Sequence, residues 1–512
     1  MRNALALKER PGEEAPPQVY GWRPYALAFS ASWASAMYGY DSAFIGGTLN
    51  LPSFQHTFGL ADASKSAKAN LSSNIVSTFQ GGAFFGSAIG FFLAERFGRK
   101  PIIIVSAIIF MAGAILQMIG RLDLLYVGRV LTGWGVGSSA MILPIYVSEC
   151  SPALIRGRLV GVFEIMLQIA LVFGFWVNYR VNKNISPSEK QWHIPVAVQF
   201  IPAGLLVLTM IPMIESPRWL VSKGKIREAA KALSWIRHLP EDDPYILSEL
   251  GKVEHAIEGE VAATGSTRNW RQIGKELFSK GVRGRVVLSF SMMIFQNFTG
   301  INAINYYSPT IFNSIGFTGT SNGLLATGVF GIVKMVATIL YAVWLVDRVG
   351  RRNLLLIGGS FEQTPPLDSV AKAAVTMIYI YALFYGLSWN GIPWLFCAEV
   401  LPTRVRTAGM AFCVCIQWLT QFVVVYSLPH MVIGIKYGTF LFFGCCSVLA
   451  IVFAWFFLPE TKRVALEDMD LIFGPDVFIA AKKAMRNYEE LRDARVAMVD
   501  EKSGVVLREG SV

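Results

Sequence analysis

The stretch that decides the fold is "ERFGRK", residues 95–100, together with its counterpart "DRVGRR", residues 347–352. Each is a basic turn that follows a long apolar run. Two further motifs occur once in each half of the chain and in the same order: "YVSECSPALIRGR" (146–158) with "FCAEVLPTRVR" (396–406), and "ESPRWL" (215–220) with "PETKR" (459–463). Three motifs repeated in register indicate an internal duplication of a multi-helix unit.

The composition indicates a polytopic membrane protein. Of 512 residues, 53% are hydrophobic and 16% are charged, whereas soluble domains carry about 25% charged residues. The net charge of +11 comes from Lys and Arg in short loops and tails, a pattern that sets membrane topology rather than one that forms a nucleic-acid-binding face. We therefore expect a lipid bilayer as the environment and no nucleic acid as a partner.

Apolar runs long enough to cross about 30 Å of hydrocarbon predict eleven helical spans, six before a polar stretch and five after it. They are 25–49, 74–94, 101–119, 124–146, 159–179, 193–214, 285–305, 323–346, 372–396, 407–428 and 437–458. The basic turns alternate with these spans so that the positive-inside rule places both termini in the cytosol. The expected divisions are a tail (1–24), an N-terminal six-helix half (25–214), cytosolic linker helices (215–283), a C-terminal half (284–458) and a second tail (459–512).

The C-terminal half lacks a full ninth helix. Between "DRVGRR" and the span starting near Ala371 there is only "NLLLIGG", followed by the polar "SFEQTPPLDS". "DRVGRR" and "PTRVR" both belong on the cytosolic side, and one helix cannot start and end there. An extended strand would leave its backbone unpaired in lipid. We predict that one helix of a twelve-helix plan has been lost by exon skipping or a wrong gene model, which leaves open an inactive, truncated isoform.

These motifs resemble those of the sugar-porter family of the major facilitator superfamily. Within it, the segments "GYDSAFIGGTL", "NYYSPTIF", "LLATGVFGIVK" and "LSWNGIPW" are most similar to fungal quinate permeases. The resemblance implies an all-α major facilitator fold of two six-helix halves and a multi-pass protein of the cell membrane. It also implies proton-coupled uptake of a cyclic polyol or its acid, by a monomer.

The repeated charged motifs predict a cytosolic gate. In the family, such carboxylates and guanidiniums link the two halves when the transporter faces outward, and the planar fork of Arg suits a bidentate contact. Charges that merely set topology and complement helix ends are the alternative. The gate candidates are Glu95, Arg99, Glu149, Arg156, Glu215, Arg218, Asp347, Arg351, Glu399, Arg404 and Glu460.

Asp41 and Arg129 are the candidates for proton coupling. Each lies inside an apolar run, Asp41 past the middle of the first span and Arg129 near the start of the fourth. Because these two spans run in opposite directions, both residues lie in the outer half of the membrane. A carboxylate beside Arg stays ionised, and its protonation releases the partner. A static ion pair is the alternative; the family's symporters carry Asp and Arg at these places.

Amide and aromatic side chains predict the substrate site, because each hydroxyl of a sugar or polyol needs donors and acceptors. The candidates are Gln168, Gln296, Asn297, Asn302, Trp389, Asn390, Gln417 and Gln421. Ordinary helix–helix hydrogen bonding is the alternative for any one amide. Tyr306 and Tyr307 are expected to be outer-gate aromatics, whereas Trp418 is expected to be packing. Gly391 and Pro393 should interrupt their helix.

Lys334 is an ammonium near the middle of the span 323–346, where a charge costs about 2.5–3.5 kcal/mol. By resemblance it falls where glucose carriers have an asparagine that touches the sugar. It is too central to reach water easily, and the C-terminal half offers no acid at its depth. We therefore expect it to bind the carboxylate of a substrate such as quinate.

Other functions have less support. The alternatives are a hexose, pentose or uronate transporter and a non-transporting nutrient sensor, although the C-terminal tail is short for a receptor. No metal cluster, nucleotide loop or nucleophile–base pair is visible, so we expect no enzyme, no metal and no cofactor. The six cysteines have no metal-ligand spacing. Asn70 begins a sequon on the expected outer side, which suggests a glycoprotein.

Overall fold

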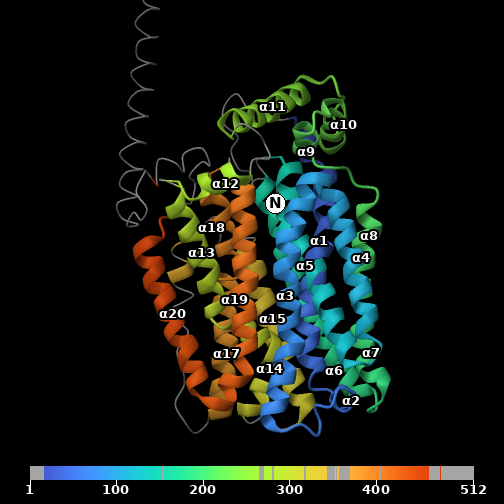
Figure 1. Cartoon of the computed structure of the whole chain (residues 1–512), viewed down its shortest axis with the longest axis vertical. Coiled ribbons are helices and arrows are strands. Elements are labelled where there is room, and N and C mark those ends of the chain that lie inside the picture. The colour runs from blue at the N-terminus through green and yellow to red at the C-terminus, as the bar shows by residue number, and fades with distance from the viewer. Residues whose placement is uncertain are drawn as a thin grey trace, which may run out of the picture.

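The computed structural model describes residues 16–152, 155–264, 270–279, 282–315, 319–342, 352, 354–356, 370–402, 405–460 and 473. Long helices run side by side through these ranges and form one elongated bundle (Figure 1). Short helices cross one end of the bundle, which we call the linker end, whereas α2 (Pro52–Thr57) lies at the opposite end, the far end.

The N-terminal half contains five long helices and one pair of shorter ones. They are α1 (Trp22–Thr48), α3 (Lys65–Phe97), α4 (Arg99–Gln117), α5 (Leu122–Cys150), α6 (Arg156–Asn184), α7 (Glu189–Ala197) and α8 (Phe200–Met210). Helices α3 and α4 are separated by Gly98 alone, which has a φ of 110°. A Cβ there would lie 2.3 Å from a carboxylate oxygen of Glu215. Glycine is therefore required by both its backbone conformation and this close approach.

The linker end is covered by α9 (Pro217–Ser222), α10 (Ile226–Arg237) and α11 (Pro244–Thr264), and α12 (Trp270–Leu277) follows them. All four lie in the stretch predicted as linker helices. Helix α10 buries one face at helical spacing, through Ala229, Leu233 and Ile236. Arg237 ties the linker to the bundle, because it pairs with Glu249 of α11 at 2.5 Å and donates to the carbonyl of Cys150 at 2.9 Å.

The C-terminal half contains α13 (Arg283–Phe298), α14 (Ile301–Ile315), α15 (Thr320–Leu340), α17 (Val370–Leu387), α18 (Ile392–Val400), α19 (Arg406–Gly434) and α20 (Gly438–Phe457). One predicted span is interrupted between α13 and α14, where Gly300 has a φ of 90°. The interruption between α17 and α18 lies at Gly391 and Pro393, as the sequence predicts.

Within the described residues, nine helices are long and apolar enough to cross a membrane, counting α7 with α8 and α13 with α14 as one each. They confirm nine of the eleven predicted spans. The other two coincide with α1 and with the pair α17 and α18. Most of the stretch that lacks a ninth helix, residues 357–369, lies outside the described residues. Before it, Arg352 and residues 354–356 are helical.

The duplication is visible in the backbone. After α5 the chain leaves the helix at Ser151, with φ −82° and ψ 139°. After α18 it does so at Leu401, with φ −70° and ψ 130°. The N–H of Ile155 then donates to the carbonyl of Pro152 at 3.2 Å, and the N–H of Val405 donates to that of Pro402 at 3.1 Å. The two repeated motifs therefore form the same turn.

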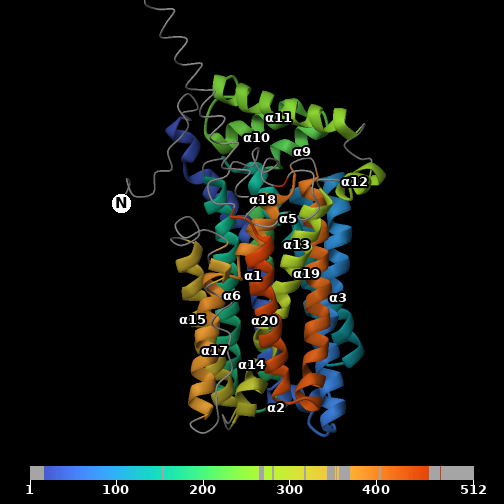
Figure 2. The same ribbon diagram turned by 90° about the vertical axis from the view of Figure 1, so that its left-hand side faces the viewer.

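Among the described residues, the two halves pack mainly along the helix pairs α1 with α14, α3 with α19, and α6 with α15, and α5 also touches α19. Figure 2 shows α3 beside α19 and α6 beside α15. Near the far end, α1 and α14 approach closely, since a Cβ on Gly46 would lie 2.2 Å from the carbonyl oxygen of Tyr306.

Candidate functional site

Asp41 and Arg129 are in contact and buried between helices of the N-terminal half. One guanidinium nitrogen of Arg129 donates to both carboxylate oxygens of Asp41, each at 2.8 Å, and both side chains are 0% exposed. The Nε of Arg129 donates to the carbonyl of Ile75 at 3.2 Å, and its guanidinium lies 4.7 Å from the ring centre of Phe79. The remaining nitrogen, Nη2, has no partner among the described residues. This arginine would therefore be left as a buried cation if Asp41 were neutralised.

Contacts between the halves close the far end. The hydroxyls of Ser42 and Tyr306 lie 3.1 Å apart, and Gln421 donates to that of Tyr306 at 3.2 Å. Nearer the tip, His430 Nε2 and Asn70 Oδ1 lie 2.6 Å apart. Because Ser42 is the neighbour of Asp41, the buried ion pair is next to the seam between the halves.

Predicted substrate residues gather deeper in the bundle, where several amide oxygens are unsatisfied. The Oε1 atoms of four buried glutamines find no donor among the described residues; these are Gln168, Gln296, Gln417 and Gln421. The amide nitrogens of three of them donate to protein groups. Gln168 donates to Glu164 at 2.9 Å, Gln296 donates to the carbonyl of Asn390 at 2.9 Å, and Gln421 donates to Tyr306. Buried acceptors without donors fit a ligand that carries hydroxyl groups.

The other predicted substrate residues are engaged by protein groups. Asn297 donates to the carbonyl of Gln417 at 3.4 Å and accepts from Asn302 at 2.8 Å. The indole N–H of Trp389 donates to the carbonyl of Leu355 at 3.1 Å, so Trp389 anchors the helical turn that precedes the predicted gap. Trp418 packs across the seam, with ring centres 5.1 Å from Tyr38 and 6.0 Å from Phe79.

Lys334 is 2% exposed on α15, and the acid near it comes from the N-terminal half, which the sequence interpretation did not consider. Glu164, on α6 of the other half, lies within electrostatic range. The Nζ of Lys334 lies 5.7 Å from the ring centre of Tyr385 and makes no hydrogen bond or ion pair within 4 Å in the part of the chain that the structure describes. The carboxylate is near but leaves the ammonium without direct contact.

Glu164 is the functional candidate that the sequence interpretation missed. Its Oε1 accepts from Gln168 of its own helix and from Asn390 of the other half. The signal was available, since Glu164 lies within the predicted span 159–179 and an ionisable residue in a membrane is a candidate by default. The expectation for Lys334 covered the C-terminal half, whereas Glu164 belongs to the N-terminal half.

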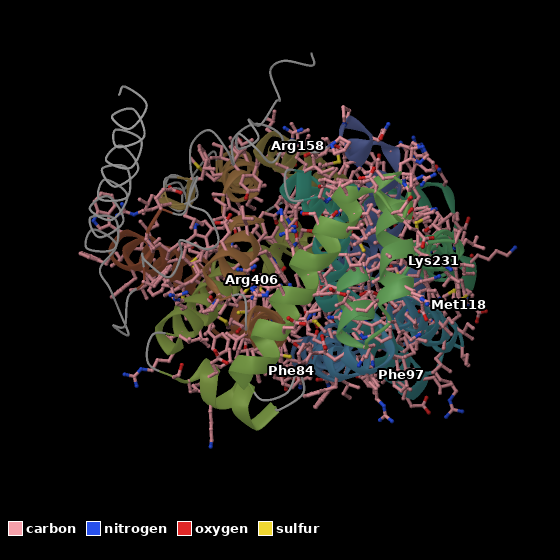
Figure 3. The ribbon with its side chains drawn as sticks, turned by 90° about the horizontal axis from the view of Figure 1, so that it is seen from above. Phe84, Phe97, Met118, Arg158, Lys231 and Arg406 are labelled. Carbon is pink, nitrogen blue, oxygen red and sulfur yellow. The ribbon has the colours of Figure 1, made fainter. Side chains whose placement is uncertain are left out.

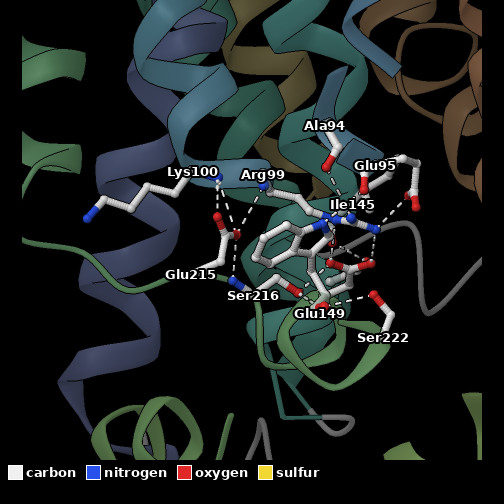
Figure 4. Close-up of polar contacts among 11 residues, drawn as sticks. Ala94, Glu95, Arg99, Lys100, Ile145, Glu149, Glu215, Ser216 and Ser222 are labelled. Atoms are coloured by element: carbon white, nitrogen blue, oxygen red, sulfur yellow. Dashed lines mark hydrogen bonds and ion pairs between the residues drawn. The ribbon is translucent and has the colours of Figure 1, made fainter. Parts of the chain in front are cut away.

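At the linker end, Arg99 holds three helices together (Figure 4). Its guanidinium donates to Glu95 of α3 at 2.8 Å and to both carboxylate oxygens of Glu149 of α5, at 3.1 and 3.2 Å. Glu215 accepts from the backbone N–H of Arg99 at 3.1 Å and of Lys100 at 3.3 Å, which places its charge at the N-terminus of α4. Burial raises the pKa of Glu215, while these N–H groups favour its charged form.

The second half repeats this arrangement. Glu460 accepts from the backbone N–H of Arg352 at 3.1 Å, and Arg352 is the motif equivalent of Lys100. The side chains of these two residues also make equivalent contacts. Lys100 donates to the carbonyl of Ile211 at 2.8 Å, and Arg352 donates to the carbonyl of Trp455 at 2.8 Å.

The remaining gate candidates are only partly visible. Arg156 begins α6, Arg218 lies in α9, and Glu399 lies near the end of α18. Arg156 is the motif equivalent of Arg406, the first residue of α19. Figure 3 views this end from above and labels Arg406 and Arg158, which lies in the first turn of α6. Asp347, Arg351 and Arg404 lie outside the described residues.

Comparisons with known proteins agree with this geometry. The family model described as "Sugar (and other) transporter" matches residues 27–473. The chain belongs to this sugar transporter family. A quinate permease of Neurospora terricola is 42% identical over 545 aligned positions, which cover 99% of each chain. A probable quinate permease of Neosartorya fischeri is 44% identical and covers 92% of this chain and 90% of its own.

Solved structures assign the fold. The major facilitator superfamily proton:xylose symporter XylE, bound to 6-bromo-6-deoxy-D-glucose, has a TM-score of 0.74 and 26% identity, over 88% of this chain and 99% of its own. A partially occluded, inward-open form of the xylose transporter XylE from E. coli has a TM-score of 0.72 and 25% identity, over 87% of this chain and 100% of its own. This member of the sugar transporter family is therefore a multi-pass membrane transporter with the major facilitator fold.

Proposed function

We propose that this protein takes up quinate, or a closely related cyclic polyol acid, together with a proton. The observation that carries the proposal is Lys334, a buried ammonium that has no direct partner among the described residues, in a bundle whose predicted substrate glutamines have amide oxygens without donors in the same residues. A polyol acid supplies both missing groups, because its carboxylate accepts from the ammonium and its hydroxyls donate to the amide oxygens. The relatives named quinate permease support this choice of substrate.

Asp41 and Arg129 are the proposed coupling pair. Protonation of Asp41 removes the negative charge that the guanidinium binds and leaves Arg129 to its carbonyl and aromatic contacts. Because Ser42 touches Tyr306 of the other half, a change at Asp41 acts directly on the seam. The proton can thereby favour one arrangement of the two halves over the other.

The transport cycle is proposed to be alternating access. The positive-inside rule assigns the linker end and both termini to the cytosol, which makes the far end the outer one. The contacts of Tyr306 and His430 that bridge the halves at that end support a state closed to the outside as one step of this cycle. The Arg99 and Glu460 networks would then form the cytosolic gate, in a monomer of the cell membrane.

Two alternatives rest on specific observations. A neutral sugar carrier is favoured by the likeness to XylE, but such a substrate gives Lys334 no anion. An inactive isoform is favoured by the alignment with the Neurospora terricola permease, whose 545 positions exceed the 512 residues of this chain by 33. At least that many positions of the alignment therefore lie opposite gaps in this chain, enough for one span of about twenty residues and its turns.

The test is uptake of labelled quinate into proteoliposomes that contain the purified chain, with and without an acidic exterior. We expect accumulation that needs the proton gradient and is competed by other polyol acids. Equal uptake without a gradient would contradict coupling. Absence of any uptake would contradict the proposal for this chain and favour the inactive isoform.

A further inference from the structure

Glu164 and Lys334 form an open charge pair between the two halves of the transporter. Glu164 belongs to α6 and Lys334 to α15, two helices that pack together across the seam. They interact electrostatically, yet no ion pair within 4 Å joins them among the described residues. Both printed contacts of the carboxylate, from Gln168 and Asn390, go to Oε1. Its Oε2 accepts no hydrogen bond in the described part of the chain, so each charge keeps one unsatisfied side.

The described groups on the neighbouring helices have other partners or carry no charge. Tyr38 of α1 is the titratable group that faces Glu164 from that helix, and Tyr385 faces Lys334. On helix α5, Arg129 forms an ion pair with Asp41 and Glu149 forms one with Arg99. Helix α7 directs His193 to the carbonyl of Met118. Among the described residues, Glu164 and Lys334 are therefore the two charged groups at this site that have no ion-pair partner within 4 Å.

An anionic substrate changes this balance. When Lys334 is bound to a carboxylate of the substrate, the site holds two negative charges and one positive charge. An uncompensated charge in a low-dielectric interior is costly, and the cost is removed when a carboxylate takes up a proton. Glu164 can take it, because its protonated form donates through Oε2 to a substrate oxygen while Oε1 keeps its two amide contacts.

We propose that Glu164 is a second protonation site, which takes up one proton from the aqueous phase when the carboxylate of the substrate binds Lys334. This inference rests on the proposed function and adds a proton site apart from Asp41. It also accounts for specificity: a neutral polyol leaves the Glu164–Lys334 pair balanced and draws no proton into the site. Discrimination between an acid and a neutral polyol should then depend on pH.

The test is proton uptake on quinate binding to the purified protein in weakly buffered detergent solution, with myo-inositol as the neutral ligand. The wild type should take up one proton per quinate and none with inositol. Its Kd for quinate should rise about tenfold per pH unit above the protonation range of the site. Glu164→Gln keeps an oxygen for the two amide contacts, so it should bind quinate without proton uptake and with a flat pH profile.

Controls separate the possible outcomes. Asp123→Asn, which alters an exposed pair with Arg121, should behave as the wild type. Asp41→Asn should still take up a proton when quinate binds. Proton uptake that persists in Glu164→Gln, or that is lost only in Asp41→Asn, would overturn the inference and leave the proposed function standing. A wild type that does not bind quinate would overturn the proposed function and this inference together. If Glu164→Gln fails to fold, Glu164→Ala is the second variant, and a Kd for quinate that still rises with pH there would also contradict the inference.

Discussion

One guanidinium nitrogen of Arg129 donates to both carboxylate oxygens of Asp41 at 2.8 Å, and neither side chain is exposed to solvent. Breaking such a buried pair on one side leaves the other charge uncompensated. The pair is therefore stable while Asp41 is ionised and changes state when it is protonated. We therefore propose that the pair acts as a switch rather than as a static support, and the same physical reasoning extends to the other charged sites.

The first prediction concerns this switch. Asp41→Asn should abolish proton-driven accumulation of quinate, because the amide cannot take up and release a proton, while exchange of quinate across the membrane at equal concentrations persists. Counterflow and gradient-driven uptake in proteoliposomes measure the two activities. Asp123→Asn, on the same helix as Arg129 but exposed, is the matched control and should change neither. Gradient-driven accumulation by Asp41→Asn would contradict the coupling role.

The second prediction concerns the stability of the linker-end network. Glu149→Gln removes the charge that Arg99 contacts through two nitrogens, and both side chains are less than a tenth exposed, at 8% and 7%. We expect a loss of about 3 kcal/mol in the free energy of unfolding. Glu95→Gln, which removes a partner that is 30% exposed, should cost less than about 1 kcal/mol. Thermal unfolding in detergent compares the two, and equal shifts in Tm would contradict this ranking.

The third prediction concerns glycosylation. Asn70 lies within α3, and its side-chain oxygen is 2.6 Å from His430 of the other half, so a glycan there would break a contact across the seam. A second sequon, Asn184-Ile185-Ser186, begins at the exposed last residue of α6 at the same end. In a eukaryotic host, Asn184→Gln should remove the glycosidase-sensitive mobility shift and Asn70→Gln should leave it. Loss of the shift in Asn70→Gln alone would show that the far end is modified at Asn70.

The fourth prediction concerns the ninth helix. The turn at Arg352 and residues 354–356 is helical and held by Glu460 and Trp389, so the helix begins correctly before its expected gap. Sequencing of transcripts across the codons of Gly358 to Asp368 should find a longer isoform with an additional exon that encodes about twenty to fifty residues. That longer isoform should give greater quinate uptake per molecule. A genomic sequence that encodes no further apolar segment there would contradict the loss of an exon.

Much of this molecule follows from its sequence. Apolar runs place the helices, and repeated motifs anticipate the matching turns at Pro152 and Pro402. Opposite helix directions place Asp41 and Arg129 at one depth. Contacts across the seam are less predictable, because helical periodicity says which face is apolar but not which neighbour covers it. For this reason the sequence suggests no partner for Lys334, whereas Glu164 lies nearby on the opposite half. Nor does it suggest that the indole N–H of Trp389 donates to the carbonyl of Leu355.

The most direct test of the account is competition between quinate and myo-inositol for binding to the wild type and to Lys334→Asn. We predict that the wild type prefers quinate and that the variant loses most of this preference, because a charge-assisted contact to the carboxylate contributes about 1.5–3 kcal/mol, or roughly tenfold to a hundredfold in Kd. Inositol binding should persist in the variant, which shows that the site remains folded. An unchanged preference for quinate in Lys334→Asn would contradict the assignment of this transporter to polyol acids through Lys334.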